Sequence, residues 1–424
     1  MNIRAHGSVP PDTGVAHVGL PTMRRHDSTR LALVASLLLA LLLTACDSSP
    51  APVLKTPIAT ANLASENLYI ACSGGVIHVL RARDGAVAPP LYELAGPLAS
   101  APTLSAGVLY NGERNSIGDP GDTALVARDI ATRRELWRTV TPGNVVAPPV
   151  IQQDTVYAVA NNNAVSTLLA LDARSGAIRW RYESREGIVG SPTVNGETVW
   201  AATSPSFGAG GSLLALRAQD GTLLWRVPLA EGSRSSPVLA QGILYAGSFL
   251  GALYALRADT GATVWVYHTT LSSAINLSVL DGVVYASADD GTLFALNSAD
   301  GRRLWTRSSI ARHLGWGDIL AQDQTIYAGA PDGLLYAVDA RTGATLRAYQ
   351  LDDQPPITGA DTSLIIWSAP ILRDGVLYIE RTAGDQRYPV SQVPSQVIAI
   401  DRDTGAVRWT QTILDAPCSP LVIG

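Results

Sequence analysis

The stretch Gly251-Ala-Leu-Tyr-Ala-Leu-Arg-Ala-Asp-Thr-Gly-Ala-Thr-Val-Trp265 contains an alternating apolar segment, a turn and the start of a second apolar segment. The first segment alternates as a half-buried strand does. Asp259-Thr260-Gly261 then supplies turn residues, including a glycine that readily adopts positive φ. Leu213–Trp225 and Leu293–Trp305 repeat the same order of residue types. Because self-similarity at a fixed period is the signature of a repeat architecture, this unit predicts the fold.

Eight copies of the unit follow one another from Leu68 onward. Each begins with a strand that carries one aromatic residue: Tyr69, Tyr110, Tyr157, Trp200, Tyr245, Tyr285, Tyr327 and Tyr378. Seven have a turn glycine: Gly85, Gly176, Gly221, Gly261, Gly301, Gly343 and Gly405. Six have a Trp in the last strand: Trp137, Trp180, Trp225, Trp265, Trp305 and Trp409. The second copy has Ala131-Thr132 in place of the glycine, and the first and seventh have Pro89 and Arg347 near the Trp position.

A short further strand precedes the aromatic strand. In five copies a Pro lies at a constant distance before the aromatic residue, in Ser100-Ala-Pro102, Ala147-Pro-Pro149, Gly190-Ser-Pro192, Ser235-Ser-Pro237 and Ser368-Ala-Pro370. This spacing predicts a tight hairpin, with turns such as Gln241-Gly242. The sequence therefore predicts an all-β protein, an eight-bladed β-propeller of four-stranded antiparallel blades in which ring closure leaves only short edges.

The N-terminus is typical of an export signal. Arg24, Arg25 and Arg30 precede the apolar run Leu31–Leu43, which is too short to span a bilayer. Leu43-Thr-Ala-Cys46 resembles a bacterial lipobox and predicts residues 1–46 as signal peptide, with lipidation at Cys46. The alternative is an ordinary signal in which the Cys is coincidental.

Residues 1–22 are either a long n-region or lie before the true start, since Met23 would make a more ordinary first residue. Residues 47–62 are rich in Ser, Pro, Ala and Thr and predict a flexible tether. The remaining residues, 63–424, form the predicted propeller.

Composition excludes one class of partner. The 424 residues carry a net charge of −5, only 16% of them are charged, and Lys55 is the single lysine. Nucleic-acid binding needs a basic surface, so we expect no nucleic-acid partner. A ring closed within one chain predicts a monomer.

The repeated motifs resemble the PQQ-like β-propeller repeat over about residues 56–424: Ser-Pro, the aromatic strand, Leu-Tyr-Ala-Leu, Asp-x-x-Thr-Gly and Trp. WD40 propellers differ, since no repeat here has their Trp-Asp or Gly-His marks. With eight blades and a lipobox, the chain resembles the lipoprotein propellers of the outer-membrane β-barrel assembly machinery. That resemblance implies a role in assembling envelope proteins, although a fold alone does not determine activity.

One Trp per blade at a constant position is what packing between blades requires. An aromatic side chain buries about 150–250 Å², and its loss from a core costs about 3–5 kcal/mol. We therefore interpret the six repeated Trp residues as structural. Trp316 and Trp367 lie outside that position and are candidates for a surface or channel site, with core packing as the alternative.

Quinoprotein dehydrogenases share the repeat and hold PQQ and Ca²⁺ beside a disulfide between adjacent cysteines. Here only Cys72 and Cys418 follow Cys46, and no haem-attachment motif is present. His78, His268 and His313 are not at metal-ligand spacing, and Asp289-Asp-Gly291 and Asp332-Gly333 fit turns better than Ca²⁺ loops. We expect no enzyme activity, no cofactor and no metal. The alternatives are a PQQ-dependent dehydrogenase or a propeller that binds a small ligand.

Four long insertions fall where loops emerge on one face of a propeller: residues 111–123, 203–211, 350–366 and 381–396. Long loops on a rigid scaffold commonly carry function, and these favour protein recognition; the alternative is drifted surface loops. We expect an exported, membrane-anchored lipoprotein, on the periplasmic or extracellular side, that acts as a binding scaffold for other envelope proteins. Asp47 after Cys46 favours retention at the inner membrane under the proteobacterial sorting rule.

The chain ends in a ninth short strand, Cys418-Ser-Pro-Leu-Val-Ile-Gly424, which we expect beside Leu68–Cys72 as the closing strand. Residues 53–60 are the rival for that place. In the fifth repeat a two-residue turn pairs Val238 with Tyr245 and Ser235 with Ser248, and these two serines correspond to Cys418 and Cys72. Directly opposed Cβ atoms lie about 4.5–5.5 Å apart, so we predict a Cys72–Cys418 disulfide. Two unpaired buried cysteines are the alternative.

Overall fold

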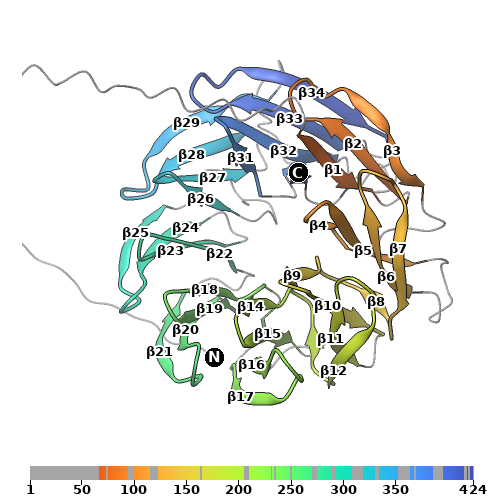
Figure 1. Cartoon of the computed structure of the whole chain (residues 1–424). Helices are drawn as coiled ribbons and strands as arrows, with labels where there is room; N and C mark the ends of the chain where they lie inside the picture. Colours follow the sequence, from red (N-terminus) through yellow and green to blue (C-terminus); the bar gives the residue numbers. More distant parts are fainter. Residues whose placement is uncertain are drawn as a thin grey trace, which may run out of the picture. The chain divides into compact units, whose positions relative to one another are not determined.

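The computed structural model describes residues 66–72, 75–93, 100–114, 123–162, 165–204, 210–230, 232–233, 235–248, 251–269, 275–288, 292–307, 319–329, 334–351, 363–366, 369–384, 395–414, 418 and 421–423. They belong to one compact unit, Thr60–Gly424. Its strands form eight antiparallel sheets arranged as blades around a ring (Figure 1), which confirms the predicted eight-bladed propeller. No helix among these residues is long and apolar enough to cross a membrane.

Several predictions fall on residues outside the described ranges. They are the signal peptide 1–46 with Cys46, the tether 47–62, the rival strand 53–60, the turns Asp289-Asp-Gly291 and Asp332-Gly333, and the residues His313, Trp316 and Trp367.

The strands of each blade follow one another from the ring axis outward. Blade 2 consists of β4 (Thr103–Ser105), β5 (Val108–Arg114), β6 (Thr123–Asp129) and β7 (Glu135–Val140), and blade 3 consists of β9 (Val150–Gln152), β10 (Thr155–Asn161), β11 (Ser166–Asp172) and β12 (Ile178–Ser184). Blade 4 consists of β14 (Thr193–Asn195), β15 (Thr198–Ser204), β16 (Ser212–Arg217) and β17 (Leu223–Pro228). Blade 5 consists of β18 (Val238–Ala240), β19 (Ile243–Gly247), β20 (Ala252–Arg257) and β21 (Thr263–His268).

Blade 6 consists of β22 (Ile275–Leu280), β23 (Val283–Ala288), β24 (Leu293–Asn297) and β25 (Arg303–Arg307); blade 7 of β26 (Leu320–Gln322), β27 (Thr325–Gly329), β28 (Leu335–Asp339) and β29 (Thr345–Tyr349); and blade 8 of β31 (Ile371–Arg373), β32 (Val376–Gly384), β33 (Ser395–Asp401) and β34 (Val407–Ile413). Three additional short strands, β8 (Asn144–Val145), β13 (Gly187–Ile188) and β30 (Ser363–Ile366), pair with β10, β15 and β32.

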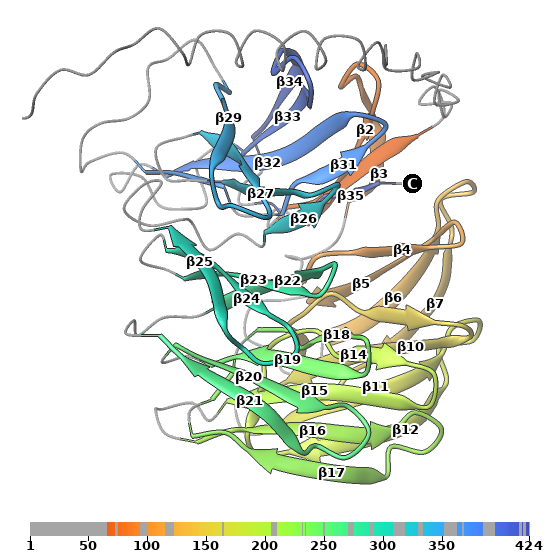
Figure 2. The ribbon, with the colours of Figure 1, turned by 90° about the vertical axis from the view of Figure 1, so that its left-hand side faces the viewer.

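Blade 1 combines both ends of the propeller. β1 (Asn67–Ala71), β2 (Val76–Arg81) and β3 (Val87–Glu93) come from its start, and β35 (Val422–Ile423) from the end of the chain. β35 pairs antiparallel with β1, so the C-terminus lies at the first blade (Figures 1 and 2). A Cys72–Cys418 disulfide joins the two segments, as predicted.

The closing pairing differs in one detail from the fifth repeat. There Val238 lies opposite Tyr245, as expected. The same register would place Leu421 opposite Tyr69, but Val422 lies there instead. The closing segment therefore accommodates one additional residue between the Cys418 bridge and β35, and Leu421 is buried in the cluster between the last and first blades.

The core lies between the blades. Each cluster of buried side chains draws on two neighbouring blades, such as Tyr245 and Leu253 of blade 5 with Phe294 of blade 6. The aromatic strand and the strand after it are almost continuously buried because both of their faces pack on neighbouring sheets. Stability of the ring therefore depends on what joins one blade to the next.

Candidate functional site

The two faces of the ring are built differently. One face, here the turn face, carries the turns between the first and second and between the third and fourth strands of each blade. The other, the loop face, carries the connections between the second and third strands and between blades. All four predicted insertions belong to the loop face, and residues 115–122, 205–209, 352–362 and 385–394 within them lie outside the described ranges.

The insertions are shorter than the sequence suggested, because strands continue into them. Residues 111–114 belong to β5, residues 203–204 to β15 and residues 381–384 to β32, while residues 363–366 form β30. At the ends of β5, β15 and β32, polar residues interrupt the apolar pattern although the backbone pairing continues, so the predicted boundaries were wrong there. β32 therefore has nine residues and pairs with β30, β31 and β33.

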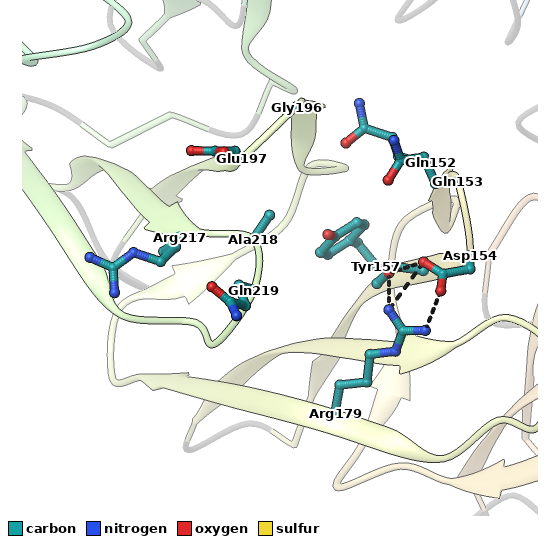
Figure 3. Close-up of a pocket in the computed structure, with 11 residues that line it drawn as sticks. Gln152, Gln153, Asp154, Tyr157, Arg179, Gly196, Glu197, Arg217, Ala218 and Gln219 are labelled. Carbon is teal, nitrogen blue, oxygen red and sulfur yellow. Dashed lines mark hydrogen bonds and ion pairs between the residues drawn. The ribbon is translucent and has the colours of Figure 1, made fainter.

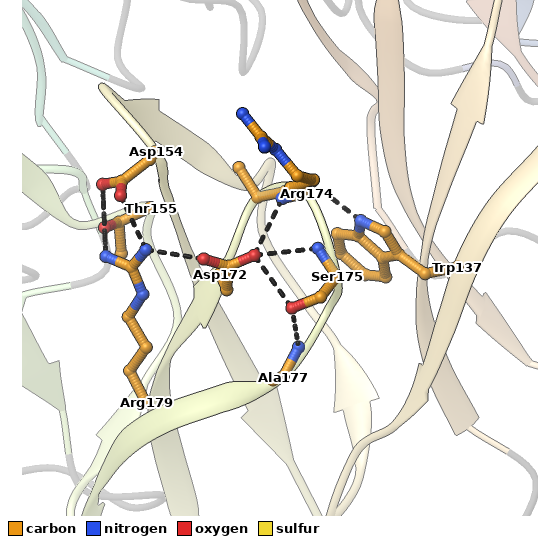
Figure 4. A network of polar contacts seen from close by, with 9 residues as sticks. Trp137, Asp154, Thr155, Asp172, Arg174, Ser175, Ala177 and Arg179 are labelled. Atoms are coloured by element: carbon orange, nitrogen blue, oxygen red, sulfur yellow. Dashed lines mark hydrogen bonds and ion pairs between the residues drawn. The ribbon is translucent and has the colours of Figure 1, made fainter.

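On the turn face, an aspartate that begins the turn between the third and fourth strands accepts hydrogen bonds from the turn residues, and this arrangement recurs in several blades. In blade 3 the Asp172 carboxylate accepts hydrogen bonds from the Ser175 amide and hydroxyl, both at 2.8 Å, and from the Arg174 amide at 3.1 Å (Figure 4). Its other oxygen lies 2.7 Å from Arg179 Nη2. The contact with Arg179, followed by those with Ser175, holds the pKa of the Asp172 carboxyl well below its usual range. These turns are fixed, charged elements.

The repeated Trp residues join neighbouring blades. Trp180 of blade 3 donates from Nε1 to the Ala218 carbonyl of blade 4 at 2.7 Å. Its ring lies against Gly221, which has φ +73°, and a Cβ there would be 2.7 Å from Trp180 Cε3. We call this arrangement a Trp–Gly joint. In chain order, the six Trp residues bond the carbonyls of Ala173, Ala218, Ala258, Ser298, Ala340 and Ala82 and lie against Gly176, Gly221, Gly261, Gly301, Gly343 and Gly85.

The aromatic residue of the second strand supports the same acceptor. At the last joint the Tyr378 hydroxyl and Trp409 Nε1 both donate to the Ala82 carbonyl, at 3.3 and 2.9 Å. Burial raises the pKa of Tyr378 to about 12, so the hydroxyl remains a donor. In blade 4 the aromatic residue is Trp200, whose Nε1 donates to Ala258 at 3.1 Å.

Two joints lack the Trp. Between blades 7 and 8, Arg347 takes its place and donates to the Thr404 and Asp403 carbonyls at 2.9 and 2.8 Å. Between blades 1 and 2, the strand register puts Ala88 at the Trp position, next to Pro89, which the sequence placed near it. The facing turn has Arg133 at the glycine position, with φ +61°, rather than Ala131-Thr132 as predicted. A Cβ is tolerated there because no indole ring covers the turn.

A buried ion cluster lies at the joint between blades 1 and 2. Glu113 of β5 and Arg128 of β6 form an ion pair and are 3% and 4% exposed. Arg138 Nη2 contacts the other Glu113 oxygen at 2.6 Å, and Glu135 accepts from Arg128 at 3.1 Å. Strand alternation puts Glu113 and Arg128 on the side of blade 2 whose Leu109 packs against blade 1.

Sequence analysis missed this cluster. Glu113 fell within a predicted loop, and Arg128 was assigned no role. The sequence did contain an indication of a buried ion pair, namely two charged residues of opposite sign among alternating apolar residues in neighbouring strands.

A polar cleft of about 430 Å³ opens on the turn face between blades 3 and 4 (Figure 3). Its walls are the first turn of blade 3, with Gln152 and Asp154, and both turns of blade 4, with Glu197 and Gln219. Arg179 lines the cleft but is held by Asp154 at 2.8 Å, Thr155 at 2.7 Å and Asp172 at 2.7 Å. Sequence analysis did not single out these residues, because each turn looks ordinary by itself.

Comparison with known proteins finds a family and a fold. The family model of the outer membrane protein assembly factor BamB matches residues 93–238 and 209–379. No curated protein matches the chain. Among solved structures, BamB from Moraxella catarrhalis is 22% identical, with a TM-score of 0.57 over 74% of this chain and 88% of that chain.

Two other solved structures show the same fold. A quinohemoprotein alcohol dehydrogenase from Comamonas testosteroni is 16% identical, with a TM-score of 0.57 over 75% of this chain and 69% of the enzyme. The computationally designed protein Ika8 is 15% identical, with a TM-score of 0.57 over 75% and 94% of the two chains. Identities this low support the propeller fold alone.

Proposed function

The chain belongs to the family of the outer membrane protein assembly factor BamB, and from this premise we propose that it is an exported, lipid-anchored scaffold that binds other envelope proteins during outer-membrane protein assembly. The observation that carries the proposal is the match of this family's model to residues 93–238 and 209–379. The match reaches from the first blade into the eighth, so it concerns the propeller as a whole.

The loop face is the surface that we propose for the partner. Leu414, directly after β34, and Val140, the last residue of β7, are 78% and 66% exposed on this face, more than the other large apolar side chains of the described residues. β7 and β34 belong to blades 2 and 8, in which two of the long insertions connect the second and third strands. Binding residues are commonly found on loops that a rigid scaffold positions. At the other ends of the same strands, near the turn face, Val407 and Leu136 are less exposed.

We propose a non-catalytic role. Three dehydrogenases that share the fold are only 13%, 14% and 16% identical to this chain, and fold does not determine activity. The cysteines also support the proposal, because Cys72 and Cys418 are used to close the ring rather than forming an adjacent pair. Incubation with PQQ, Ca²⁺, alcohols, aldoses and a dye acceptor should give no turnover above the protein-free control; turnover would assign a dehydrogenase.

Photocrosslinking in the native envelope tests the partner surface. p-Benzoylphenylalanine at Val140 or Leu414 should capture the same envelope protein, one that acts in assembling outer-membrane proteins. The matched positions Leu136 and Val407 lie on the same two strands and should not capture it. Equal capture from all four positions, or capture only from Leu136 and Val407, would contradict the loop-face proposal.

The lipid anchor is proposed at Cys46, which lies outside the described residues. A fatty-acid analogue should label the wild type and not Cys46→Ala. Equal labelling of the two proteins would contradict the anchor and leave the crosslinking result unaffected.

A further inference from the structure

The residue type at one turn position differs among the eight blades. This position lies three residues before the aromatic residue of the second strand, and its carbonyl accepts a hydrogen bond from the turn after the third strand in every blade. Four blades have glycine there: Gly107, Gly242, Gly282 and Gly375. Blade 7 has Gln324, and blades 1, 3 and 4 have the carboxylates Glu66, Asp154 and Glu197. The neighbouring blades 3 and 4 thus place two carboxylates beside one cleft.

Two of the three carboxylates have an arginine. Glu66 lies 3.2 Å from Arg373, and Asp154 lies 2.8 Å from Arg179. Glu197 is exposed at the cleft and has no ion pair with any cation of the described residues. Leu224 stands before Trp225 where blade 3 has Arg179 before Trp180, so blade 4 lacks the corresponding arginine.

The charged residues that line the cleft are Asp154, Glu197, Arg179 and Arg217, and they differ in whether they have an ion-pair partner. Arg179 is held by Asp154 and Asp172, and Arg217 lies 3.1 Å from Asp220. Glu197 is therefore the lining carboxylate that has no arginine partner among the described residues, while Asp154 and both arginines are already paired. Gln152, Gln153 and Gln219 add amide oxygens that can accept hydrogen bonds. The surroundings therefore favour a cation that carries several hydrogen-bond donors.

We propose that this cleft binds an arginine or lysine side chain from an extended segment of a protein partner, with Glu197 as its counter-ion. The inference rests on the proposed role as a protein-binding scaffold and adds a second site on the face opposite the long loops. A cleft of about 430 Å³ is within the usual size of ligand pockets. A guanidinium is the best-matched cation, because it can form two parallel hydrogen bonds to one carboxylate.

The test uses the full chain labelled with ¹⁵N-tryptophan and titrated with N-acetyl-arginine amide. The indole of Trp180 is the reporter, since it bonds the Ala218 carbonyl at the cleft, and Trp305 is the remote reference. We expect a saturable shift of the Trp180 signal, at least a fivefold weaker affinity in Glu197→Gln, and no saturation with the neutral isostere N-acetyl-citrulline amide.

The matched control is Asp281→Asn, an exposed carboxylate in the corresponding turn of blade 6, which should bind like the wild type. Equal affinity of Glu197→Gln and wild type, equal binding of the citrulline compound, or no saturable shift would each overturn the proposal. None of these results depends on the long loops. A failure here therefore leaves the crosslinks from Val140 and Leu414 intact, and the two proposals fail separately.

Discussion

The joint between blades 1 and 2 differs from the joint between blades 2 and 3 in almost every contact. In the latter, the Trp137 ring covers Gly176 and its Nε1 bonds the Ala173 carbonyl at 2.9 Å. The former has neither the Trp nor the glycine, and instead buries the ion cluster of Glu113 and Arg128. Blade 2 thus presents an apolar joint on one side and a charged joint on the other.

At the joint between blades 1 and 2 the Trp and the facing glycine are both absent, whereas the joint between blades 7 and 8 loses the Trp but keeps Gly405 beside Arg347. A Trp needs a facing glycine because a Cβ would overlap the ring, so a turn that loses the Trp can also lose the glycine. A charged joint has another requirement, since each buried charge needs its counter-ion. Replacing a single residue should therefore be costly at both joints, but for different reasons.

The largest effect should come from opening the ring beside the charged joint. The disulfide closes a loop across a sequence separation of 346 residues. Without it, in Cys72→Ser/Cys418→Ser, the unfolded chain gains conformational entropy. On the chain-entropy formula the free energy of unfolding falls by at most about 5–6 kcal/mol. Urea unfolding of the oxidised proteins measures this loss, with Cys46→Ala as control. An unchanged midpoint would show that β35 closes the ring without the bond.

The charged joint should be broken by Glu113→Gln, which leaves Arg128 buried without its nearest counter-ion. Removing one partner of a buried pair costs about 3–5 kcal/mol. Glu135→Gln is the matched control, because Glu135 is partly exposed and Arg128 keeps Glu113; its cost should stay within about 1 kcal/mol. The double change Glu113→Leu/Arg128→Met should recover most of the loss. Equal losses in Glu113→Gln and Glu135→Gln would contradict the assigned burial.

The sequence predicted the joints that use residues repeated in most blades, and it missed the joint whose residues occur only once. Trp is rare in this chain, with 9 among 424 residues, so its constant spacing from a turn glycine reveals the blades. The register mapped from the fifth repeat placed Cys72 opposite Cys418. The pair Glu113–Arg128 depends on strand register at the edge of an irregular insertion, where no repeat supplies a template. The cleft at Glu197 was missed for a similar reason, because it arises only when turns of two blades come together.

The apolar joint should be broken by Gly176→Ala. A Cβ at Gly176 would lie 2.6 Å from Trp137 Cε3, and φ is +73°. Overpacking costs about 1–3 kcal/mol, and the left-handed conformation adds about 1–2 kcal/mol. Gly375→Ala is the matched control, since φ is +74° and nothing lies within 4 Å of the added Cβ. The thermal midpoint should fall further in Gly176→Ala than in Gly375→Ala. Equal shifts would show that the backbone conformation alone causes the loss and that the contact with Trp137 contributes nothing.

The smallest effect should come from Arg133→Gly, the corresponding position at the charged joint. Arg133 has φ +61°, so glycine relieves about 1–2 kcal/mol of left-handed strain. Glycine also makes the unfolded chain more flexible, which costs about 0.4–1 kcal/mol. The two contributions oppose each other, and the contact made by the exposed Arg133 side chain should add little. The free energy of unfolding should therefore change by less than about 1 kcal/mol. Gly176→Arg, the reverse change at the apolar joint, should be strongly destabilising because the Trp137 ring blocks the side chain. If urea unfolding instead shows a large loss in Arg133→Gly, the Arg133 side chain itself supports the joint between blades 1 and 2, and the pairing of Trp with glycine would not explain why this turn lacks glycine.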